Sequence, residues 1–496
     1  MLSTRAFTRT HHIDGPLRRP MRDAHQSSLR NWLRTDVPAS TVPWIGDSMT
    51  TLFQHGPLGA KITVVVVGDG FGPLDQEAYN QAVDNLLTNG LFAQDFFKAY
   101  KSAFNLLRIN LVSVDSGVST RTYDASGAVV AQVNRNTALG AIYNGDWAHC
   151  WVEDGPQTGD RLARALSIWV SDHRLVILLL NNPGFGGCGG GGRATLPLGV
   201  SWSTVAHEFG HALGGLGDEY HQTNNQYTGG EPGEPNLTIN TDRATVKWSG
   251  DINPTTPIPT GGDDYRPPKP AGWDDNKGVG LFEGGAGSFD RGIFRPVVDC
   301  RMRSNSPAFC PVCERAMAAQ AAPHLPVRAL AEEDETAMGA EEIDSYVRLL
   351  VHVEDGELNI VEAREVEGPL VQPGILTAGL AHELFLGDRR VSIGSHPDVG
   401  ISRSFSEVGA DGPRAHHTYA PEVFDFVVRV PTGELRAAAS TNLTLNLLSL
   451  DAPTTLAAGK SAMVESPEAN AALVATTGNL TVAELPQSLR QFIEAE

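Results

Sequence analysis

The chain has 496 residues, of which 41% are hydrophobic and 19% charged, and it carries a net charge of −20. This balance excludes a wholly disordered or coiled-coil chain, and the negative charge argues against an extended nucleic-acid surface, because phosphate binding needs clustered Lys and Arg. No apolar stretch reaches the roughly 18–20 residues of a membrane span, and five cysteines are too few for a disulfide scaffold of this length.

Residues 1–60 show neither helical nor strand periodicity. They contain no run of about 7–15 apolar residues behind a basic start, so no secretory signal is visible. Their arginines suggest a transit peptide only weakly, because Asp14 and Asp23 accompany them and no amphipathic face is present. We predict that residues 1–60 form an N-terminal extension, either mobile or wrapped over the surface.

The following part alternates strands with helices. Ile62–Val67 is a continuous apolar run rich in β-branched residues, which is typical of a strand buried on both faces. Further strands are expected at Asn105–Val114 and Leu175–Leu180. Two helices are expected, one capped by Asp75 and running through Asn89 with Ala78, Ala82 and Leu86 inside, the other capped by Asp160 with Leu162, Leu166, Trp169 and Val170 inside. This order predicts an α/β layer with a largely parallel sheet.

One motif after the third strand can bind a metal ion, His207-Glu-Phe-Gly-His211. Four residues apart on a helix, the two histidines face the same side one turn apart, so both imidazoles can reach one cation. Nitrogen ligands at tetrahedral angles suit Zn²⁺. Glu208 stands beside the first histidine, where its carboxylate can accept a proton from water on the metal. This is the metalloprotease arrangement His-Glu-x-x-His.

The third metal ligand is less clearly marked. Glycines that follow the motif can take the positive φ angles of a turn that returns the chain beneath the metal. The metzincin pattern places its third ligand six residues after the second histidine, and that position is Gly217, which has no side chain. We predict Asp218 as the third ligand, with Glu219 and His221 as alternatives. In the alternative interpretation, the Asp218 carboxylate only braces the turn and binds no metal.

These residues resemble the IgA-peptidase family of zinc metallopeptidases, a branch of the zincins. His207-Glu-Phe-Gly-His followed by Gly-Leu-Gly-Asp-Glu-Tyr220 is similar to the family signature, and Gly68-Asp69-Gly70-Phe71 is similar to its Gly-Asp-Gly-Tyr element. Other stretches occur in the expected order, namely Phe104-Asn105, Ser113–Gly117, Asn181-Asn182, Gly186-Gly187, Cys300–Ser304 and Phe309–Cys313. The resemblance covers about residues 60–320 of the chain.

The resemblance implies a zincin-like fold and a zinc-dependent endopeptidase that acts on a protein or peptide substrate. Zn²⁺ would be held by His207, His211 and Asp218, and Glu208 would be the catalytic general base. Two other functions remain open, a non-catalytic surface-binding protein on a metal-bound zincin scaffold and a zinc amidohydrolase with a non-protein substrate. The glutamate favours an enzyme, because a scaffold does not need it. Family members are generally exported, which favours an extracellular location although no signal peptide is visible.

Two loops are candidates for the walls of a substrate cleft. Phe185–Gly192 is almost all glycine, and either it borders the cleft, where an extended substrate adds to a sheet edge, or it is a flexible connector. The stretch between Tyr220 and Arg295 is too long for an ordinary connection. Its polar candidates, each with a loop-bracing contact as the alternative, are Tyr265, Arg266, Glu283, Arg291 and Arg295.

Met302 and three cysteines complete the predicted catalytic part. The resemblance places Met302 in a turn beneath the two histidines, and core filling is the alternative. Cys310-Pro-Val-Cys313 together with Cys300 has three interpretations: a redox pair, a disulfide, or a Cys₃His zinc site that also needs His324. Export of the protein would favour the disulfide.

The C-terminal part begins after an acidic run at Ala331–Asp344, which predicts a solvated linker. Alternating apolar residues, an Asp355-Gly356 turn and regularly spaced strands then predict an antiparallel β-sandwich-like domain. The expected elements are strands at 347–353, Leu358–Val361, Glu383–Leu386, Val423–Val430 and Asn442–Leu450 and a short helix within Pro486–Glu496. We therefore expect an extension (1–60), a zincin-like metallopeptidase domain (61–328), an acidic linker (329–345) and a β-rich accessory domain (346–496).

Overall fold

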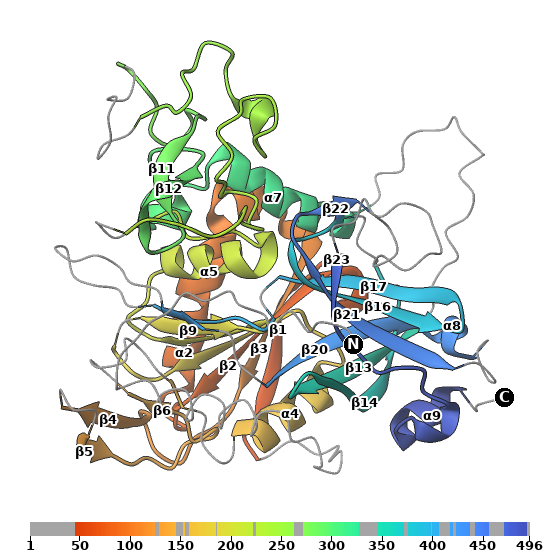
Figure 1. Cartoon of the computed structure of the whole chain (residues 1–496). Helices are drawn as coiled ribbons and strands as arrows, with labels where there is room; N and C mark the ends of the chain where they lie inside the picture. Colours follow the sequence, from red (N-terminus) through yellow and green to blue (C-terminus); the bar gives the residue numbers. More distant parts are fainter. Residues whose placement is uncertain are drawn as a thin grey trace, which may run out of the picture.

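A computed structural model describes residues 45–124, 128–144, 152–153, 158–184, 186–221, 225–261, 271–326, 345–371, 375–397, 399–405, 417–419, 423–436, 442–455 and 471–493. Most of the predicted extension and the predicted linker up to residue 344 lie outside these residues, as do Tyr265 and Arg266. The fold is α/β, with one mixed sheet and several antiparallel sheets (Figure 1). None of the helices among the described residues is long and apolar enough to span a membrane.

The largest sheet has the strand order β1-β3-β2-β8-β10-β9-β18-β19. Its strands are β1 (Ser48–Gln54), β2 (Ile62–Asp69), β3 (Phe104–Asn110), β8 (Leu175–Leu180), β9 (Gly187–Gly190), β10 (Arg193–Pro197), β18 (Ser402–Phe405) and β19 (His417–Tyr419). The four central strands β3, β2, β8 and β10 are parallel, whereas the flanking strands pair antiparallel. The prediction of a largely parallel sheet is therefore right for the centre of the sheet and wrong for its flanks.

The central strands are buried on both faces, as the sequence predicts. Every residue of β2 and of β8 is buried. Successive residues of β2 alternate between two apolar clusters, with Val64 and Val66 in one and Val65 and Val67 in the other. The first cluster includes side chains of α2 (Gln76–Val83), α5 (Trp202–Gly214) and α7 (Pro311–Ala321), and the second includes those of α4 (Thr158–Trp169). Figure 1 shows α5 and α7 above the sheet and α4 below it.

Four local predictions in this part need correction. Residues Ser48–Gln54, within the predicted extension, form edge strand β1. The buried face of α2 and the π-helical turn η2 (Asp84–Thr88) carries Tyr79, Val83 and Leu87, one position beyond the predicted face, because the Tyr79 hydroxyl reaches the sheet and donates to carbonyls 3.1 Å away. Asp75 does not cap α2 with its side chain but accepts from the Gly72 amide, and α4 begins before Asp160.

The shorter elements of this part connect and cover the main sheet. They are η1 (Leu58–Ala60), η3 (Leu91–Ala93), α3 (Asp95–Ala99), η4 (Lys101–Ala103), β4 (Ser119–Tyr123), β5 (Val129–Val133), β6 (Ile142–Tyr143), β7 (Val152–Glu153), η6 (Ser249–Asp251), β11 (Phe282–Gly285), β12 (Phe289–Arg295), α6 (Arg301–Ser304) and η7 (Ala322–His324). Strands β4 to β7 form a small separate sheet, and β11 pairs with β12.

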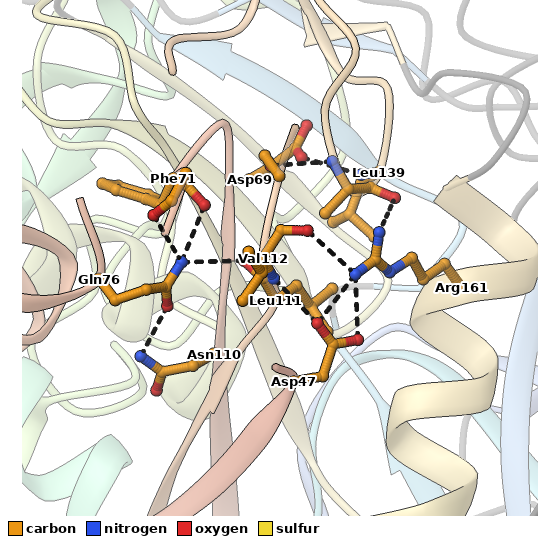
Figure 2. Close-up of polar contacts among 12 residues, drawn as sticks. Asp47, Asp69, Phe71, Gln76, Asn110, Leu111, Val112, Leu139 and Arg161 are labelled. Carbon is orange, nitrogen blue, oxygen red and sulfur yellow. Dashed lines mark hydrogen bonds and ion pairs between the residues drawn. The ribbon is translucent and has the colours of Figure 1, made fainter. Parts of the chain in front are cut away.

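Asp69, in the Gly-Asp-Gly element, is fully buried at the end of β2. Its carboxylate accepts hydrogen bonds from the Leu139 amide (2.8 Å), the Ala141 amide (3.0 Å) and the Thr137 hydroxyl (2.9 Å). Figure 2 shows it near a second junction, in which Arg161 of α4 pairs with Asp47 and donates to the Val112 carbonyl, just after β3. Burial raises the pKa of Asp69, which these hydrogen bonds partly offset. The element therefore ties a crossing loop to the sheet.

The C-terminal part contains antiparallel sheets, as predicted. One has the order β14-β13-β20 and another the order β17-β16-β21-β23. The elements are β13 (Ser345–Glu354), β14 (Glu357–Glu367), β15 (Ile375–Leu376), β16 (Gly379–Leu386), β17 (Arg389–His396), β20 (Phe424–Pro431), α8 (Thr432–Arg436), β21 (Leu443–Leu450), β22 (Thr454–Thr455), β23 (Ala471–Thr476), η9 (Val482–Glu484) and α9 (Gln487–Ile493). Residues of both sheets pack into one apolar cluster. Asp355 and Gly356 form the predicted turn with positive φ.

The two halves of the chain meet at Asp172, which is buried just before β8. Arg429 of β20 donates to both carboxylate oxygens, at 2.6 and 2.7 Å, and the Tyr346 hydroxyl of β13 donates at 2.6 Å. Arg348 of β13 lies 3.5 Å away. One carboxylate of the amino-terminal half thus binds three side chains of the other half.

Buried histidines predict that the protein loses stability in mild acid. Burial lowers the pKa of His382 to about 3, with Arg429 and Arg174 adding to the effect. A histidine that is neutral when folded and titrates near 6.5 when unfolded contributes stability that is fully present above pH 6.5 and decreases as the pH falls toward 3. We expect His382→Gln to reduce the slope of unfolding free energy against pH, between pH 5 and 6.5, by about 1.4 kcal/mol per pH unit.

The matched control is His352→Gln. The hydrogen bond that His352 donates to Asp425 raises the pKa of His352 against the effect of burial, so this residue contributes stability below pH 6.5 that is lost as the pH rises. Its removal should therefore steepen the loss of stability in acid. Equal slopes for the wild type and both variants, measured by urea unfolding at several pH values, would contradict this assignment.

Candidate metal centre

Helix α5 has well-formed ends. The Ser201 hydroxyl, at the N-cap, accepts from the Thr204 amide. At the other end Gly215 takes φ 60°, and its amide donates to the His211 carbonyl, while the next amide donates to the Gly210 carbonyl. The glycine after the motif therefore ends the helix by the left-handed turn that the sequence predicts, and the chain returns past the histidines.

Three ligand atoms converge beside α5. The Nε2 atoms of His207 and His211 are 3.1 Å apart, and Asp218 Oδ1 lies 3.0 Å from the first and 3.3 Å from the second. All three side chains are buried. Ligands placed tetrahedrally about 2.0–2.1 Å from Zn²⁺ lie about 3.3–3.4 Å from one another, close to these separations.

The other ring nitrogens fix the tautomers. His207 Nδ1 lies 2.9 Å from the Arg301 carbonyl, and His211 Nδ1 lies 2.6 Å from the Leu216 carbonyl. A carbonyl only accepts, so each Nδ1 carries the hydrogen and each neutral ring directs the lone pair of Nε2 toward the other ring and the Asp218 carboxylate. Lone pairs directed at one point repel unless a cation or proton lies between them. The donor set of two imidazoles and a carboxylate therefore fits a bound metal ion.

Glu208 faces the same region from the next position of α5. Its side chain is 7% exposed, and Oε1 is buried with no hydrogen-bond partner among the described residues. A Cβ at Gly189 of β9 would lie 3.4 Å from Glu208 Oε2. The glycine-rich segment therefore borders the site, and it is a paired strand rather than a flexible connector.

Strand β9 is not an open edge of the sheet, however. β9 pairs with β10 on one side and with β18 on the other, with Arg403 opposite Gly189. The edge at which an extended substrate was predicted to add is thus occupied by a strand of the C-terminal half.

The pKa values of the two histidines shift in opposite directions, although burial lowers both. Burial lowers the pKa of His207, but the hydrogen bond and charge of Asp218 outweigh it, so the pKa lies above its usual value. Burial and the charge of Arg403 lower the pKa of His211 despite Asp218. His211 is therefore neutral at pH 7, as a metal ligand must be.

The comparison with known families agrees with this geometry. Residues 50–267 match the family described as IgA Peptidase M64, and this segment contains the histidine pair, Glu208 and Asp218. Residues 50–267 are therefore similar to the IgA-peptidase family. No curated protein matches the chain. This similarity indicates a peptidase, a hydrolase that acts on proteins or peptides.

The two alternatives to Asp218 as the third ligand lie elsewhere. Glu219 is fully buried, and its Oε1 accepts from Asn236 (2.9 Å) and Cys313 (3.3 Å). Burial raises the pKa of Glu219 well above its usual range. His221 lies against β11, where a Cβ at Gly284 would approach its Nδ1 to 2.8 Å. The geometry thus favours Asp218, whose role as a ligand stays a prediction.

Met302 lies against the back of α5. It is fully buried in α6, and a Cβ at Gly210 would lie 2.6 Å from its sulfur. Gly210 stands between the two histidines, and Met302 follows Arg301, whose carbonyl binds His207. Met302 therefore packs behind the motif, and Gly210 leaves the space for it.

We expect Gly210→Ala to lower the unfolding free energy by about 1–3 kcal/mol, because the added methyl group overpacks this contact. Phe309 and Leu216 lie 3.1 and 3.2 Å from the new atom, which leaves little room for Met302 to yield. Gly250→Ala is the control, because nothing lies within 4 Å of a Cβ there. Urea unfolding checks the difference, and equal midpoints for the two variants would contradict it.

Two of the predicted cleft-lining residues, Glu283 and Arg295, make contacts that brace the long loop. Arg295 is buried and donates to the carbonyls of Glu283 (2.6 Å) and Gly284 (3.1 Å). Glu283 accepts from the Gly292 amide. The Arg291 backbone holds Tyr227. Tyr265 and Arg266 lie outside the described residues.

Sequence reasoning missed several groups at this candidate metal centre. The carbonyls of Arg301 and Leu216 orient the rings, and backbone groups leave no signal in side-chain identity. Arg403 comes from a strand far along the chain, and no local pattern connects it with the motif. Glu219 was considered as a ligand of this centre because it adjoins Asp218, but its carboxylate contacts Asn236 and Cys313 instead.

Proposed function

We propose that this protein is a zinc-dependent endopeptidase in which His207, His211 and Asp218 hold Zn²⁺. The observation that carries the proposal is the convergence of two Nε2 lone pairs and Asp218 Oδ1, at 3.0–3.3 Å, beside the buried Glu208 carboxylate. Two imidazoles and one carboxylate suit Zn²⁺, whereas Ca²⁺ and Mg²⁺ prefer oxygen ligands.

When bound, Zn²⁺ supplies a Lewis acid that polarises a carbonyl group and lowers the pKa of water from 15.7 toward about 7. Glu208 accepts a proton from the attacking water on its carboxylate, holds it, and donates it to the amine that leaves. The Arg301 and Leu216 carbonyls hold the imidazoles in the tautomer that leaves Nε2 unprotonated. The packed surroundings of α5 keep these side chains in place.

The proposal includes the organisation of the chain. Residues 61–328 would form the zincin-like catalytic domain around α5 and the mixed sheet, and residues 346–496 an accessory domain with a β-sandwich-like layout. An extension (1–60) and an acidic linker (329–345) would complete the chain. The pairing of β18 with β9 supports a close association, because the accessory part supplies a strand to the catalytic sheet.

The test combines metal analysis with proteolysis. We expect the purified chain to contain zinc, to cleave unfolded casein, to lose that activity with a chelator and to regain it when Zn²⁺ is added. Bound metal without turnover on a peptide library would support the scaffold interpretation and contradict the proposal. Hydrolysis of small amides with no peptide cleavage would support an amidohydrolase instead.

A further inference from the structure

A second cluster of metal-ligand side chains lies behind the metal centre. It consists of Cys300, Cys310, Cys313 and Glu219, all buried, with one ligand atom of each within 4.8 Å of the others. The three cysteines are free thiols. The cluster combines the predicted cysteine triplet with a carboxylate that the sequence analysis had considered for a different site.

The spacing of these atoms fits a tetrahedral metal ion. Cys300 Sγ and Cys313 Sγ are 3.8 Å apart, and Cys313 Sγ lies 3.3 Å from Glu219 Oε1. Sulfur ligands about 2.3 Å from Zn²⁺ at tetrahedral angles lie about 3.8 Å apart, and a sulfur and an oxygen ligand about 3.5 Å apart. A disulfide requires about 2.05 Å between sulfur atoms.

The surroundings favour anionic ligands. Cys310 is the N-cap of α7, so its thiol lies at the positive end of an 11-residue helix. The Cys310 amide lies 3.3 Å from Cys300 Sγ, and Asn236 donates to Glu219 Oε1. Glu219 Oε2 is buried and has no hydrogen-bond partner among the described residues. A carboxylate buried in this way needs a cation or a proton.

Two earlier interpretations fit less well. A disulfide between two of the cysteines would leave one buried thiol and the Glu219 carboxylate without a counter-ion. In the Cys₃His site His324 would be the fourth ligand. However, its Nδ1 lies 2.9 Å from the Ala60 carbonyl, and its carbonyl accepts from Lys61, so His324 belongs to a different junction.

We propose that Cys300, Cys310, Cys313 and Glu219 form a second, structural Zn²⁺ site with a closed Cys₃Glu ligand set. All four positions are filled by protein, so this site binds the ion without an open position for a substrate. It goes beyond the proposed peptidase function and does not depend on it.

The position of the site gives it a bracing role. Glu219 directly follows Asp218, and its amide donates to the Met302 carbonyl at 2.8 Å. Cys300 directly precedes Arg301, whose carbonyl binds His207. A Zn²⁺ ion held by these residues ties the Asp218 segment, the Arg301–Met302 turn and α7 together behind α5.

The first experiment needs no change to the cluster. The full-length chain, loaded with Zn²⁺, is examined by elemental analysis and X-ray absorption, together with His211→Ala, which removes a ligand of the first centre. We expect two zinc ions per chain in the wild type, and in His211→Ala one ion with a sulfur shell at about 2.3 Å. Zinc without sulfur neighbours, or a disulfide among the three cysteines of the natively purified chain, would overturn the proposal.

Variants then test the ligand set. Cys310→Ser and Glu219→Gln should lose the sulfur-bound ion, or bind it more weakly, whereas His324→Gln, the matched control, should retain both ions. Loss of the sulfur-bound ion in His324→Gln with retention in Glu219→Gln would contradict the Cys₃Glu assignment. A sulfur-bound ion in a chain that cleaves no peptide would contradict the proposed function alone, so the two proposals fail separately.

Discussion

In Glu208→Gln protein we expect kcat/KM for casein or peptide cleavage to fall about 10²–10⁴-fold with the zinc content unchanged. Glutamine keeps the shape of the side chain but cannot accept a proton from water and deliver it to the leaving amine. Glu208 Oε1 is buried with no hydrogen-bond partner among the described residues. The substitution therefore breaks no hydrogen bond at that atom that would stabilise the fold. The folded structure should therefore tolerate the change.

The control for this prediction is Glu77→Gln, which makes the same change of charge on the exposed surface of α2. It should leave kcat/KM unaltered. Zinc content and urea unfolding are measured for both variants, so that loss of metal or of structure is not mistaken for loss of the general base. Undiminished cleavage by Glu208→Gln would refute the role of Glu208.

Asp172→Ala should lower the unfolding free energy by about 3–5 kcal/mol, because it removes one partner of a buried ion pair and leaves Arg429 uncompensated. Burial raises the pKa of Asp172, but the charges of Arg429 and Arg348 outweigh it and hold the pKa well below its usual range. With a depressed folded pKa, this stabilisation is present above about pH 3.8 and is lost as the pH falls further. It is therefore fully expressed at pH 7.

An exposed ion pair provides the comparison. Arg389 and Glu434 form a contact in which the arginine side chain is 62% exposed, and such pairs contribute about 0–1 kcal/mol. We expect the urea midpoint of Glu434→Ala to lie close to that of the wild type and that of Asp172→Ala far below it. Similar midpoints for the two variants would show that the Asp172 junction does not hold the halves together.

The elements that carry the metal centre could be predicted because their signals are local. Two histidines four residues apart share a helix face whatever the rest of the fold does, and glycines after a helix mark its end. The continuous apolar runs of β2 and β8 likewise indicate strands that are buried on both faces. The sequence therefore places α5 correctly between a strand and a turn.

The edges of the sheet could not be predicted in the same way. β1 has an interrupted alternation, because its register with β3 shifts between Thr51 and Phe53. β9 is built of glycine with one cysteine, so it has almost no side chains that could show a strand pattern. Its partner β18 lies in the other half of the chain, and only the folded structure shows that the two pair.

The cluster of Cys300, Cys310, Cys313 and Glu219 shows a different limit of prediction from sequence. Cysteine spacing identified three of its members, but the fourth was assigned to His324, which is closer in sequence. Glu219 directly follows Asp218, yet its carboxylate contacts the Cys313 thiol, whereas the carboxylate of Asp218 contacts the two histidines. Sequence distance is a poor guide to such a ligand.

The pairing of β9 with β18 also has a consequence for how the protein is made. On the ribosome, the glycine strand beside Glu208 acquires its first neighbour, β10, almost at once, but its second neighbour only after residues 402–405 have left the exit tunnel. A nascent chain that ends earlier carries an uncovered backbone edge next to its candidate metal ligands. Synthesis of the last quarter of the polypeptide closes it.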